Sequence, residues 1–325
     1  MKTIRVLAGA AMAAATLATP LLHAETFPAP HKAIRIVVPT APAGGNDAMA
    51  RIVAQRLGER LKTAVIVENK AGANGSIGSE SVARAPADGY TILLGYIATH
   101  GINPGLSKIS YDPVKDFVPI IQIAEAQGIL VVHPSVPAKS VKELVAVAKA
   151  KRGELTYASA GNGTAPHISG ELFKQLAGID MLHVPYKGSA PAVTDTLAGH
   201  AQVMFPSLVA AGQHVKSGKL RGLAVTGKKR SALFPDLPTV AEAGVPGFEI
   251  TQWYGFFAPA RTPKEVVDRL ATEIAAIMKE PDTVKRFADQ GADVVVRSGP
   301  EFGRYVESEL GKWGNFIKVA KITAD

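Results

Sequence analysis

The chain has 325 residues, of which 47% are hydrophobic and 20% are charged. This length suits two domains of about 100–200 residues each, and the composition is that of a globular protein, not a disordered or fibrous one. The sequence contains no cysteine, which excludes disulfides, thiolate metal sites, iron–sulfur clusters and cysteine nucleophiles. The formal net charge of +8 is compatible with nucleic acid, an acidic membrane surface or an anionic small molecule as partner.

The first 24 residues have the layout of a secretory signal peptide. Lys2 and Arg5 give a positive start, an uncharged and mostly apolar run extends from Ala8 to Leu22, and Ala24 ends a cleavage-type sequence. The run is too short for a comfortable membrane span, which needs about 20 apolar residues. We therefore expect residues 1–24 to be a cleaved signal peptide; a retained membrane anchor is the alternative.

The export signal and the missing cysteine together indicate a periplasmic location. An exported binding protein of a cell with one membrane is usually held by a lipid on an N-terminal cysteine, and this chain has none. We expect the mature protein to lie in the periplasm and not to be embedded in a membrane. A nucleic-acid partner is not expected, because the protein is exported and only 6% of its residues are aromatic, which is low for base stacking.

Short β-branched apolar runs alternate with longer amphipathic stretches from residue 34 onward. Such runs predict strands, and strand–helix alternation predicts parallel α/β sheets. The predicted strands are residues 34–38, 65–67, 90–94, 118–121, 129–132, 155–157, 182–184, 203–205, 220–226 and 294–296. The clearest predicted helices are residues 47–62, 140–150, 263–279, 281–290 and 300–320. In the second of these, Ser140 and Glu143 predict a capping box.

Sequence signatures of catalytic and metal sites are missing. There is no Gly-x-Ser-x-Gly nucleophile elbow, no His-Glu-x-x-His and no acidic calcium loop. Gly44-Gly45 lacks the Lys-Ser/Thr of a P-loop, and Gly161-Asn162-Gly163 lacks the third glycine of a dinucleotide fingerprint. We therefore predict no catalytic residue, no metal and no cofactor; an exported enzyme of unknown chemistry remains an alternative. Surface or packing roles are favoured over metal binding for the scattered His100, His133, His167, His183, His200 and His214.

Four times a strand runs into a loop of small residues that then opens a helix. We name these loop 1 (residues 39–47), loop 2 (71–78), loop 3 (159–167) and loop 4 (187–191). Each contains glycine, which lets the backbone approach a bound group, and each following helix presents unpaired N–H groups and partial positive charge. Because such loops gather at the carboxyl ends of parallel strands, we predict one anion pocket between two lobes. Ordinary strand–helix turns are the alternative.

Individual residues around these loops carry more specific predictions. Lys187 is the cation that we place nearest an acidic ligand. Trp253 and Tyr254 are expected to line the cleft, with core packing as the alternative. For Asp47 we favour helix capping or water binding over contact with the ligand. The expected N-caps are Asn46 or Asp47, Asn74 or Ser76, Thr164, and Ser189.

A series of motifs extends over nearly the whole chain after the leader. They are VPTAPAGGNDAMAR (38–51), VENKAGANGSIG (67–78), APADGYTILLG (85–95), LVVHPSVPAKSVKEL (130–144), LTYASAGNGTAPHISGELF (155–173), HVPYKGSAPAVTDTLAG (183–199) and LPTVAEAGVPGFE (237–249). With these motifs in this order, the chain resembles the Bug-type periplasmic substrate-binding proteins of the tripartite tricarboxylate transporter family, from about Phe27 to Val319.

The resemblance implies an α/β, two-lobed, type II periplasmic-binding-protein-like fold with a hinge and an interdomain cleft. One lobe would combine residues 25–122 with 227–325, and the other would be residues 123–226. It implies capture of a small organic carboxylate, hinge closure on it, and delivery to a membrane permease with a large and a small subunit. A monomer is expected. The alternative is a ligand sensor subunit that presents its closed form to a membrane signalling kinase.

The family's binding residues can be carried over motif by motif, and the aromatic pair after the last motif completes the set. Three positions depart from the family pattern. Thr40 replaces a frequent aromatic residue, Ala43 a frequent Gly, and Pro206 a frequent Asp, which bears on the identity of the ligand. The predicted ligand-binding residues are Thr40, Pro42, Ala43, Gly44, Gly45, Asn46, Asp47, Asn74, Gly75, Ser159, Gly161, Asn162, Gly163, Thr164, His167, Lys187, Gly188, Ser189, Trp253 and Tyr254.

Overall fold

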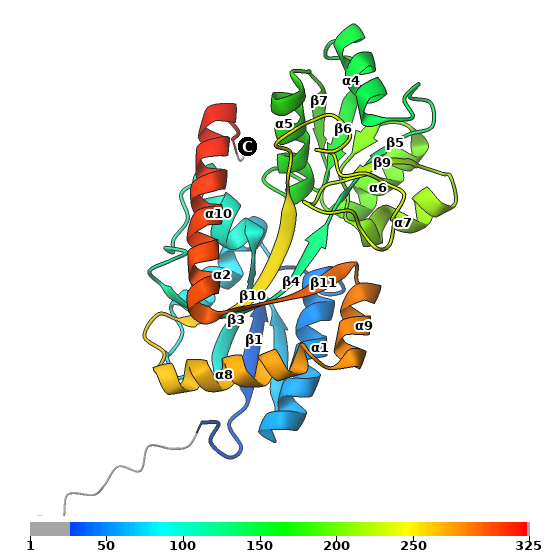
Figure 1. Cartoon of the computed structure of the whole chain (residues 1–325). Coiled ribbons are helices and arrows are strands. Elements are labelled where there is room, and N and C mark those ends of the chain that lie inside the picture. Colours follow the sequence, from blue (N-terminus) through cyan, green and yellow to red (C-terminus); the bar gives the residue numbers. More distant parts are fainter. Residues whose placement is uncertain (1–26, 324–325) are drawn as a thin grey trace, which may run out of the picture.

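Two β-sheets, each covered by helices, organise the chain (Figure 1). The structure is a computed structural model that describes residues 27–323, so the predicted signal peptide at residues 1–24 lies outside the described residues. We call the first sheet with its helices lobe 1 and the second sheet with its helices lobe 2.

The sheet of lobe 1 is mixed. Its strands are β1 (Ile34–Val38), β2 (Val65–Asn69), β3 (Thr91–Tyr96), β4 (Phe117–Gln127), β10 (Thr251–Pro259) and β11 (Ala292–Ser298). They lie in the order β11-β4-β10-β3-β1-β2. β1 runs parallel to β2 and β3, whereas β10 runs antiparallel to β3 and β4, and β11 runs antiparallel to β4. The prediction of parallel strands is therefore correct for β1 to β3 and wrong for the rest of this sheet.

The sheet of lobe 2 is also mixed. Its strands are β5 (Ile129–Val132), β6 (Thr156–Ser159), β7 (Leu182–Pro185), β8 (Val203–Met204) and β9 (Arg221–Val225). They lie in the order β7-β6-β8-β5-β9. β6 runs parallel to β7 and β8, and β5 runs antiparallel to β8 and β9. In both lobes the strands that precede the four glycine-containing loops, β1, β2, β6 and β7, belong to the parallel part of the sheet.

Helices cover both sheets. They are α1 (Gly45–Leu61), α2 (Ser76–Ala83), α3 (Asn103–Leu106), α4 (Val141–Ala150), α5 (Ala165–Ala177), α6 (Ser189–Ala198), α7 (Leu208–Lys216), α8 (Lys264–Ile277), α9 (Pro281–Asp289) and α10 (Gly299–Ala320), with short turns η1 (Ala73–Gly75) and η2 (Ala98–Ile102). The five helices predicted from spacing are confirmed within two residues at each end. Ser140 caps α4 as predicted, because its side-chain oxygen accepts the N–H of Glu143 at 3.2 Å.

Strand β10 is a strand that the sequence pattern does not predict. Gly255 interrupts its aromatic run TQWYGFFAP, yet the structure shows why a glycine stands there. A Cβ atom at Gly255 would lie 2.3 Å from the ring of Phe302 on α10. The close approach of α10 to the sheet therefore requires this glycine, and the reason lies in a residue distant along the chain.

Thr226 ties together the two places where the chain passes between the sheets. The crossings are Gly128, between β4 and β5, and Ile250, just before β10. The buried Thr226 hydroxyl accepts the Gly128 N–H at 2.8 Å and donates to the Ile250 carbonyl at 2.9 Å. Its backbone N–H donates to the Gly128 carbonyl and its carbonyl accepts the Ile250 N–H, both at 3.0 Å. One residue thus holds both crossing segments side by side.

The chain between β9 and β10 stays with lobe 2 over part of its length. The Val225 N–H donates to the carbonyl of Pro238, and the Val240 N–H donates to the carbonyl of Val225. Residues 123–127 continue β4 within the sheet of lobe 1. The lobe boundaries after residues 122 and 226 remain a prediction.

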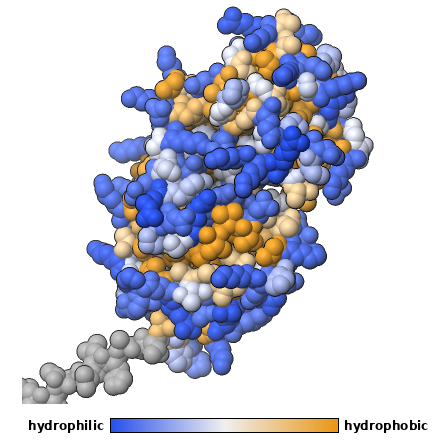
Figure 2. Space-filling model, in the orientation of Figure 1, coloured by the Kyte–Doolittle hydropathy of each residue, from blue (hydrophilic) through white to orange (hydrophobic). Residues whose placement is uncertain are grey.

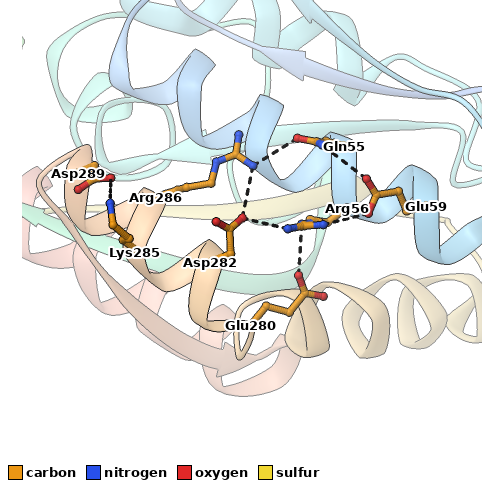
Figure 3. Close-up of polar contacts among 8 residues, drawn as sticks. All are labelled: Gln55, Arg56, Glu59, Glu280, Asp282, Lys285, Arg286 and Asp289. Carbon is orange, nitrogen blue, oxygen red and sulfur yellow. Dashed lines mark hydrogen bonds and ion pairs between the residues drawn. The ribbon is translucent and has the colours of Figure 1, made fainter.

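Charged side chains join α1 to α9 on the surface of lobe 1 (Figure 3). Arg56 of α1 lies 2.9 Å from Asp282, 3.2 Å from Glu59 and 3.4 Å from Glu280. All four side chains are partly exposed, and such pairs contribute only about 0–1 kcal/mol each. The packing of α1 on α8 and on α9 therefore depends mainly on buried apolar side chains such as Leu57 and Ile274.

Figure 2 shows polar and charged side chains spread over most of the visible face, with an apolar area on lobe 1. Within residues 27–323, no helix is both long enough and apolar enough to span a membrane.

The structure predicts the effect of removing the Thr226 hydroxyl. Thr226→Val leaves the Gly128 N–H and the Ile250 carbonyl without the partners described above, so the free energy of unfolding falls by about 1–3 kcal/mol. Urea unfolding of the purified chain measures it. The matched control is Thr194→Val on the exposed face of α6, where the hydroxyl donates only to Ala190; there we expect a change within about 0.5 kcal/mol. Equal effects of the two variants would contradict the role of Thr226.

Candidate functional site

All four loops follow strands and open helices, as predicted. Loop 1 joins β1 to α1, loop 2 joins β2 to α2, loop 3 joins β6 to α5, and loop 4 joins β7 to α6. β1 neighbours β2 in one sheet and β6 neighbours β7 in the other. The loops therefore form two adjacent pairs, one on each lobe. Within the second pair the Gly188 N–H donates to the Ala160 carbonyl at 3.2 Å.

The two pairs of loops meet where loop 2 touches loop 3. The Asn74 side-chain amide donates to the Gly163 carbonyl at 3.1 Å, across 89 residues of sequence. Leu106 of α3 packs on the same glycine, since a Cβ atom at Gly163 would lie 2.5 Å from its Cδ1. The structure thus brings both lobes together at two of the predicted site residues.

Loop 1 is held in shape by a chain of polar contacts. Asp47 Oδ2 accepts the N–H of Ala43 and the Nε–H of Arg51, both at 3.0 Å. Arg51 Nη2 donates to Asn69 Oδ1 at 3.3 Å, and Asn69 Nδ2 donates to the Thr40 carbonyl at 3.2 Å. Sequence reasoning missed Arg51 and Asn69 as supports of the loop, although Asp47 and Arg51 have the i, i+4 spacing of a helical ion pair.

The charge of Asp47 is stabilised by these contacts. Burial alone would raise the pKa of Asp47, but the hydrogen bonds from Arg51 and from the Ala43 N–H outweigh it, so the pKa lies below its usual value. Asp47 is therefore ionised at neutral pH and committed through Oδ2 to loop 1. This charge disfavours a direct contact with a carboxylate, so Oδ1 of Asp47 is suited to accept from water or from a hydroxyl.

Most of the expected N-caps are wrong. The N-cap residues are Gly44 for α1, Gly75 for α2 and Gly188 for α6. Thr164 is the N-cap of α5 as expected, but its hydroxyl donates to the Gly161 carbonyl at 2.6 Å and accepts no helix N–H. No side chain caps these four helices. The first N–H of α2, that of Ser76, donates to the Ala73 carbonyl. No side chain takes the first N–H groups of α1, α5 and α6, which suits binding of water or an anion.

Loop 1 concentrates buried polar atoms that lack a partner. Within residues 27–323, seven buried side-chain atoms have no hydrogen-bond partner, and three of them are Thr40 Oγ1, Asn46 Nδ2 and Asp47 Oδ1. Buried polar groups are nearly always satisfied, so such a cluster calls for a bound group or ordered water. The loop offers an amide donor, a hydroxyl and a carboxylate acceptor within eight residues of sequence.

Two stacked histidines support loop 3. The Gly163 N–H donates to Nδ1 of the buried His167 at 2.9 Å. The His167 ring lies 4.1 Å from that of His183, whose Nε2 is 2.7 Å from Ser159 Oγ. Burial lowers the pKa of His167, and burial with the neighbouring His167 lowers that of His183 to about 4. Both rings are therefore neutral at pH 7 and shape the loop without adding positive charge.

The aromatic pair divides between the core and the support of loop 2. Trp253 is fully buried, and its indole N–H donates to Glu309 of α10 at 3.2 Å. The indole therefore packs inside lobe 1, and we leave Trp253 out of the site. The Tyr254 ring stacks near Tyr96 at 6.5 Å, and the Tyr96 hydroxyl donates to the Asn74 carbonyl at 3.2 Å.

The remaining predicted residues lie on the loops themselves. Lys187 is exposed on loop 4, where an ammonium group can meet an anion from solvent. No group of three or more His, Asp or Glu within residues 27–323 could hold a metal ion. The chemistry that the four loops offer is hydrogen bonding from backbone N–H groups, amides and hydroxyls, which suits a carboxylate.

Two sheets, two crossing segments and a site built on paired loops define a class, the periplasmic binding proteins, and solved structures agree. An R. palustris protein with adipate superposes with a TM-score of 0.82 at 37% identity, over 90% of this chain and 99% of that one. MatC from Rhodopseudomonas palustris with bound malate gives 0.79 at 30% identity, over 89% and 99%. The predicted fold class is confirmed.

The sequence comparisons identify the family. Residues 49–322 match the tripartite tricarboxylate transporter family receptor. The chain is 35% identical over 323 residues to protein BugT of Bordetella pertussis, covering 98% of each. This chain therefore belongs to the tripartite tricarboxylate transporter family of receptors, the Bug-type substrate-binding proteins, as its motifs predict. The members of this family are receptors, not enzymes.

Asp47→Asn tests the support of loop 1. Losing the charge weakens the bond to Arg51, whose side chain is half exposed, so we expect a loss of only about 1 kcal/mol in the free energy of unfolding at pH 7. The folded pKa is below the unfolded value of about 4. The stabilisation is therefore complete above pH 4 and is lost as pH falls through the folded pKa. Urea unfolding from pH 7 to pH 3 should show the two proteins converging.

Asp268→Asn is the control for that measurement. Asp268 also pairs with a residue of its own helix, Lys264, but the two side chains are 58% and 84% exposed. We expect a change within about 0.5 kcal/mol at every pH. A wild-type advantage over Asp47→Asn that persists unchanged at pH 3 would contradict the pairing of Asp47.

Ala43→Gly tests strain in loop 1. Ala43 has φ +64°, a left-handed conformation that disfavours a side chain. Replacing it by glycine removes the strain but adds unfolded-state entropy, so we expect a net gain of at most about 1 kcal/mol. Ala43→Val should instead destabilise the protein, because a β-branched residue tolerates this conformation poorly. Thermal unfolding of both variants measures these changes. Equal Tm values for Ala43→Gly and Ala43→Val would contradict strain at this position, because they would show that the turn relaxes.

Proposed function

We propose that the chain is a periplasmic solute-binding protein that captures a small organic carboxylate between the four loops and passes it to a tripartite tricarboxylate transporter permease. The observation that carries the proposal is the cluster of unpartnered buried atoms in loop 1, Thr40 Oγ1, Asn46 Nδ2 and Asp47 Oδ1. A bound acid with its ordered water would satisfy all three.

The chemistry of the loops matches an acid in detail. Asn46 Nδ2 and the Thr40 hydroxyl can donate to a carboxylate oxygen, and the uncapped N-termini of α1 and α5 add backbone donors and partial positive charge. Asp47 Oδ1 can only accept, so it suits a water or a hydroxyl of the ligand. The proposed site residues are Thr40, Pro42, Ala43, Gly44, Gly45, Asn46, Asp47, Asn74, Gly75, Ser159, Gly161, Asn162, Gly163, Thr164, His167, Lys187, Gly188, Ser189 and Tyr254.

The relatives narrow the substrate class. Adipate and malate, which the two R. palustris structures contain, are both small dicarboxylic acids. We infer a small dicarboxylate as the first class to test. One carboxylate would meet the donors of loop 1, and the other would face loops 3 and 4, where Lys187 supplies positive charge.

Export and delivery complete the proposal. Removal of residues 1–24 would release the mature chain into the periplasm, where it would act as a monomer. Residues 25–122 with 227–325 would move as one lobe against residues 123–226 as the other, and Gly128 and Ile250 lie where the chain crosses. Ligand bound between the lobes would favour the closed form, which the permease would recognise.

A thermal-shift screen of the mature chain tests this function. Adipate, malate, succinate, citrate, glutamate and benzoate are added singly after unfolding and refolding, which removes any acid carried through purification. Ligand at 100 times its Kd stabilises by about 2.7 kcal/mol, so we expect a clear rise in Tm for at least one dicarboxylate. A flat response to every acid would contradict carboxylate binding.

Two variants sharpen the screen. Asn46→Ala removes an unpartnered donor and should raise the Kd of the acid that stabilises the protein at least about tenfold, because a hydrogen bond to a charged group contributes about 1.5–3 kcal/mol. Asn315→Ala on the exposed side of α10 is the matched control and should leave the affinity unchanged. Equal affinities in both variants would place the site elsewhere.

A further inference from the structure

Loop 2 contains an unusual run of left-handed backbone. Gly72, Ala73, Asn74 and Gly75 have φ values of +127°, +45°, +49° and +92°. Glycine adopts such angles readily, but alanine seldom does. Strained backbone of this kind persists only where the surrounding contacts over-determine it, and it marks positions where the conformation serves a purpose.

Asn103 supplies three side-chain hydrogen bonds to this part of loop 2. This residue begins α3 and is 3% exposed. Its Nδ2 donates to the Asn74 carbonyl at 3.0 Å and to Ser76 Oγ at 3.1 Å. Its Oδ1 accepts from Asn74 Nδ2 at 2.8 Å. Asn103 therefore forms hydrogen bonds with both the backbone and the side chain of Asn74.

The bonds from Asn103 orient the Asn74 side chain toward lobe 2. One N–H of the Asn74 amide is taken by Asn103, and the amide also donates to the Gly163 carbonyl of loop 3 at 3.1 Å. The Gly163 N–H is held in turn by His167. Gly163 is thus held from lobe 1 through its carbonyl and from lobe 2 through its N–H, which belong to two successive peptide groups. α3 also places Leu106 against Gly163, so this short helix supplies an apolar contact to the same residue of lobe 2 and, through Asn103, supports the polar one.

We propose that Asn103 is a positioning residue for lobe closure: it orients the Asn74 amide so that it bonds Gly163, and this clasp of Asn103, Asn74 and Gly163 sets how long a bound acid stays. The first half of this proposal, the orientation of Asn74 by Asn103, concerns the unliganded chain. The second half, the residence time of the acid, rests on the proposed function, because it has meaning only if a carboxylate binds. Asn103 lies outside the predicted ligand contacts and acts through Asn74.

The absence of cysteine from the sequence makes the first half directly measurable. Lys115→Cys in lobe 1 and Lys149→Cys in lobe 2 are both at exposed positions, and each introduced thiol can carry a nitroxide without competing sites. Pulsed electron paramagnetic resonance then gives the distance distribution between the lobes. In the unliganded full chain we expect one narrow distribution, and Asn103→Ala should shift it and broaden it.

Asn74→Gly separates an effect on the position of the lobes from a general loss of stability. Glycine favours the left-handed conformation, so this variant relaxes loop 2 while deleting the amide that reaches Gly163. We expect the same altered distance distribution as for Asn103→Ala but a smaller fall in Tm, because the relieved backbone strain offsets the lost partner of Asn103 Oδ1. Ile274→Val in the buried core of α8 is the control: it lowers Tm but should leave the distribution unchanged. An unchanged distribution in both Asn103→Ala and Asn74→Gly overturns the clasp.

Stopped-flow dissociation tests the second half, with adipate and malate as probes. Asn103→Ala should release the bound acid about fivefold to tenfold faster, the effect of losing one net hydrogen bond, while the association rate changes less than twofold. Equal dissociation rates with an altered distance distribution would overturn the link to residence time. If neither acid binds the wild-type chain, the dicarboxylate proposal fails, whereas the distance measurement still decides the clasp.

Discussion

A chain that passes twice between two sheets must hold its two crossing segments in a fixed relative position, and the hydrogen bonds of Thr226 provide that constraint. Its hydroxyl and its backbone bond to Gly128 in one crossing and to Ile250 in the other. These bonds hold the two crossing segments side by side, so the loops at the edges of the two sheets stay opposed. A buried polar node of this kind limits the ways in which the lobes can move, because most displacements would break several of its bonds.

The opposed loops share one design and differ in what supports them. Loop 1 is held by Asp47, Arg51 and Asn69, all within lobe 1. Loop 3 is held by neutral His167, stacked on His183. In both cases the side chains bond to the backbone of the loop and not to the first N–H groups of the helix, so the helix N-termini have no side-chain caps. The result is a set of preorganised donors, which is what binding a carboxylate out of water demands.

Local patterns in the sequence predict much of this fold. The β-branched runs, the amphipathic spacing of the helices and the Ser140 cap depend on neighbours in the chain, and the structure confirms them. The order of four small-residue loops likewise indicates which strand ends matter, because glycine and an opening helix mark them. The family motifs add the two-lobed architecture, which composition alone does not specify.

The parts that the sequence does not predict depend on distant partners. Gly255 in β10 is explained by Phe302, and Trp253 by Glu309, 56 residues away. Asn103 contacts Asn74 across 29 residues, and no local signal marks it as a support of loop 2. The expected N-caps differ from the observed ones by one to three residues. Gly75 and Gly188 have φ values of +92° and +115°, which favour glycine over the polar residues beside them. Gly44 has extended backbone, φ −85°, so its conformation does not require glycine.

The central claim is that loop 1 completes its hydrogen bonds with a carboxylate ligand. A crystal structure of the refolded mature chain with the dicarboxylate that stabilises it most would test this directly. The account predicts a carboxylate oxygen within about 3.2 Å of Asn46 Nδ2 or Thr40 Oγ1, with an ordered water or ligand hydroxyl at Asp47 Oδ1. An acid bound away from loop 1, with those three atoms still unpartnered, would contradict it.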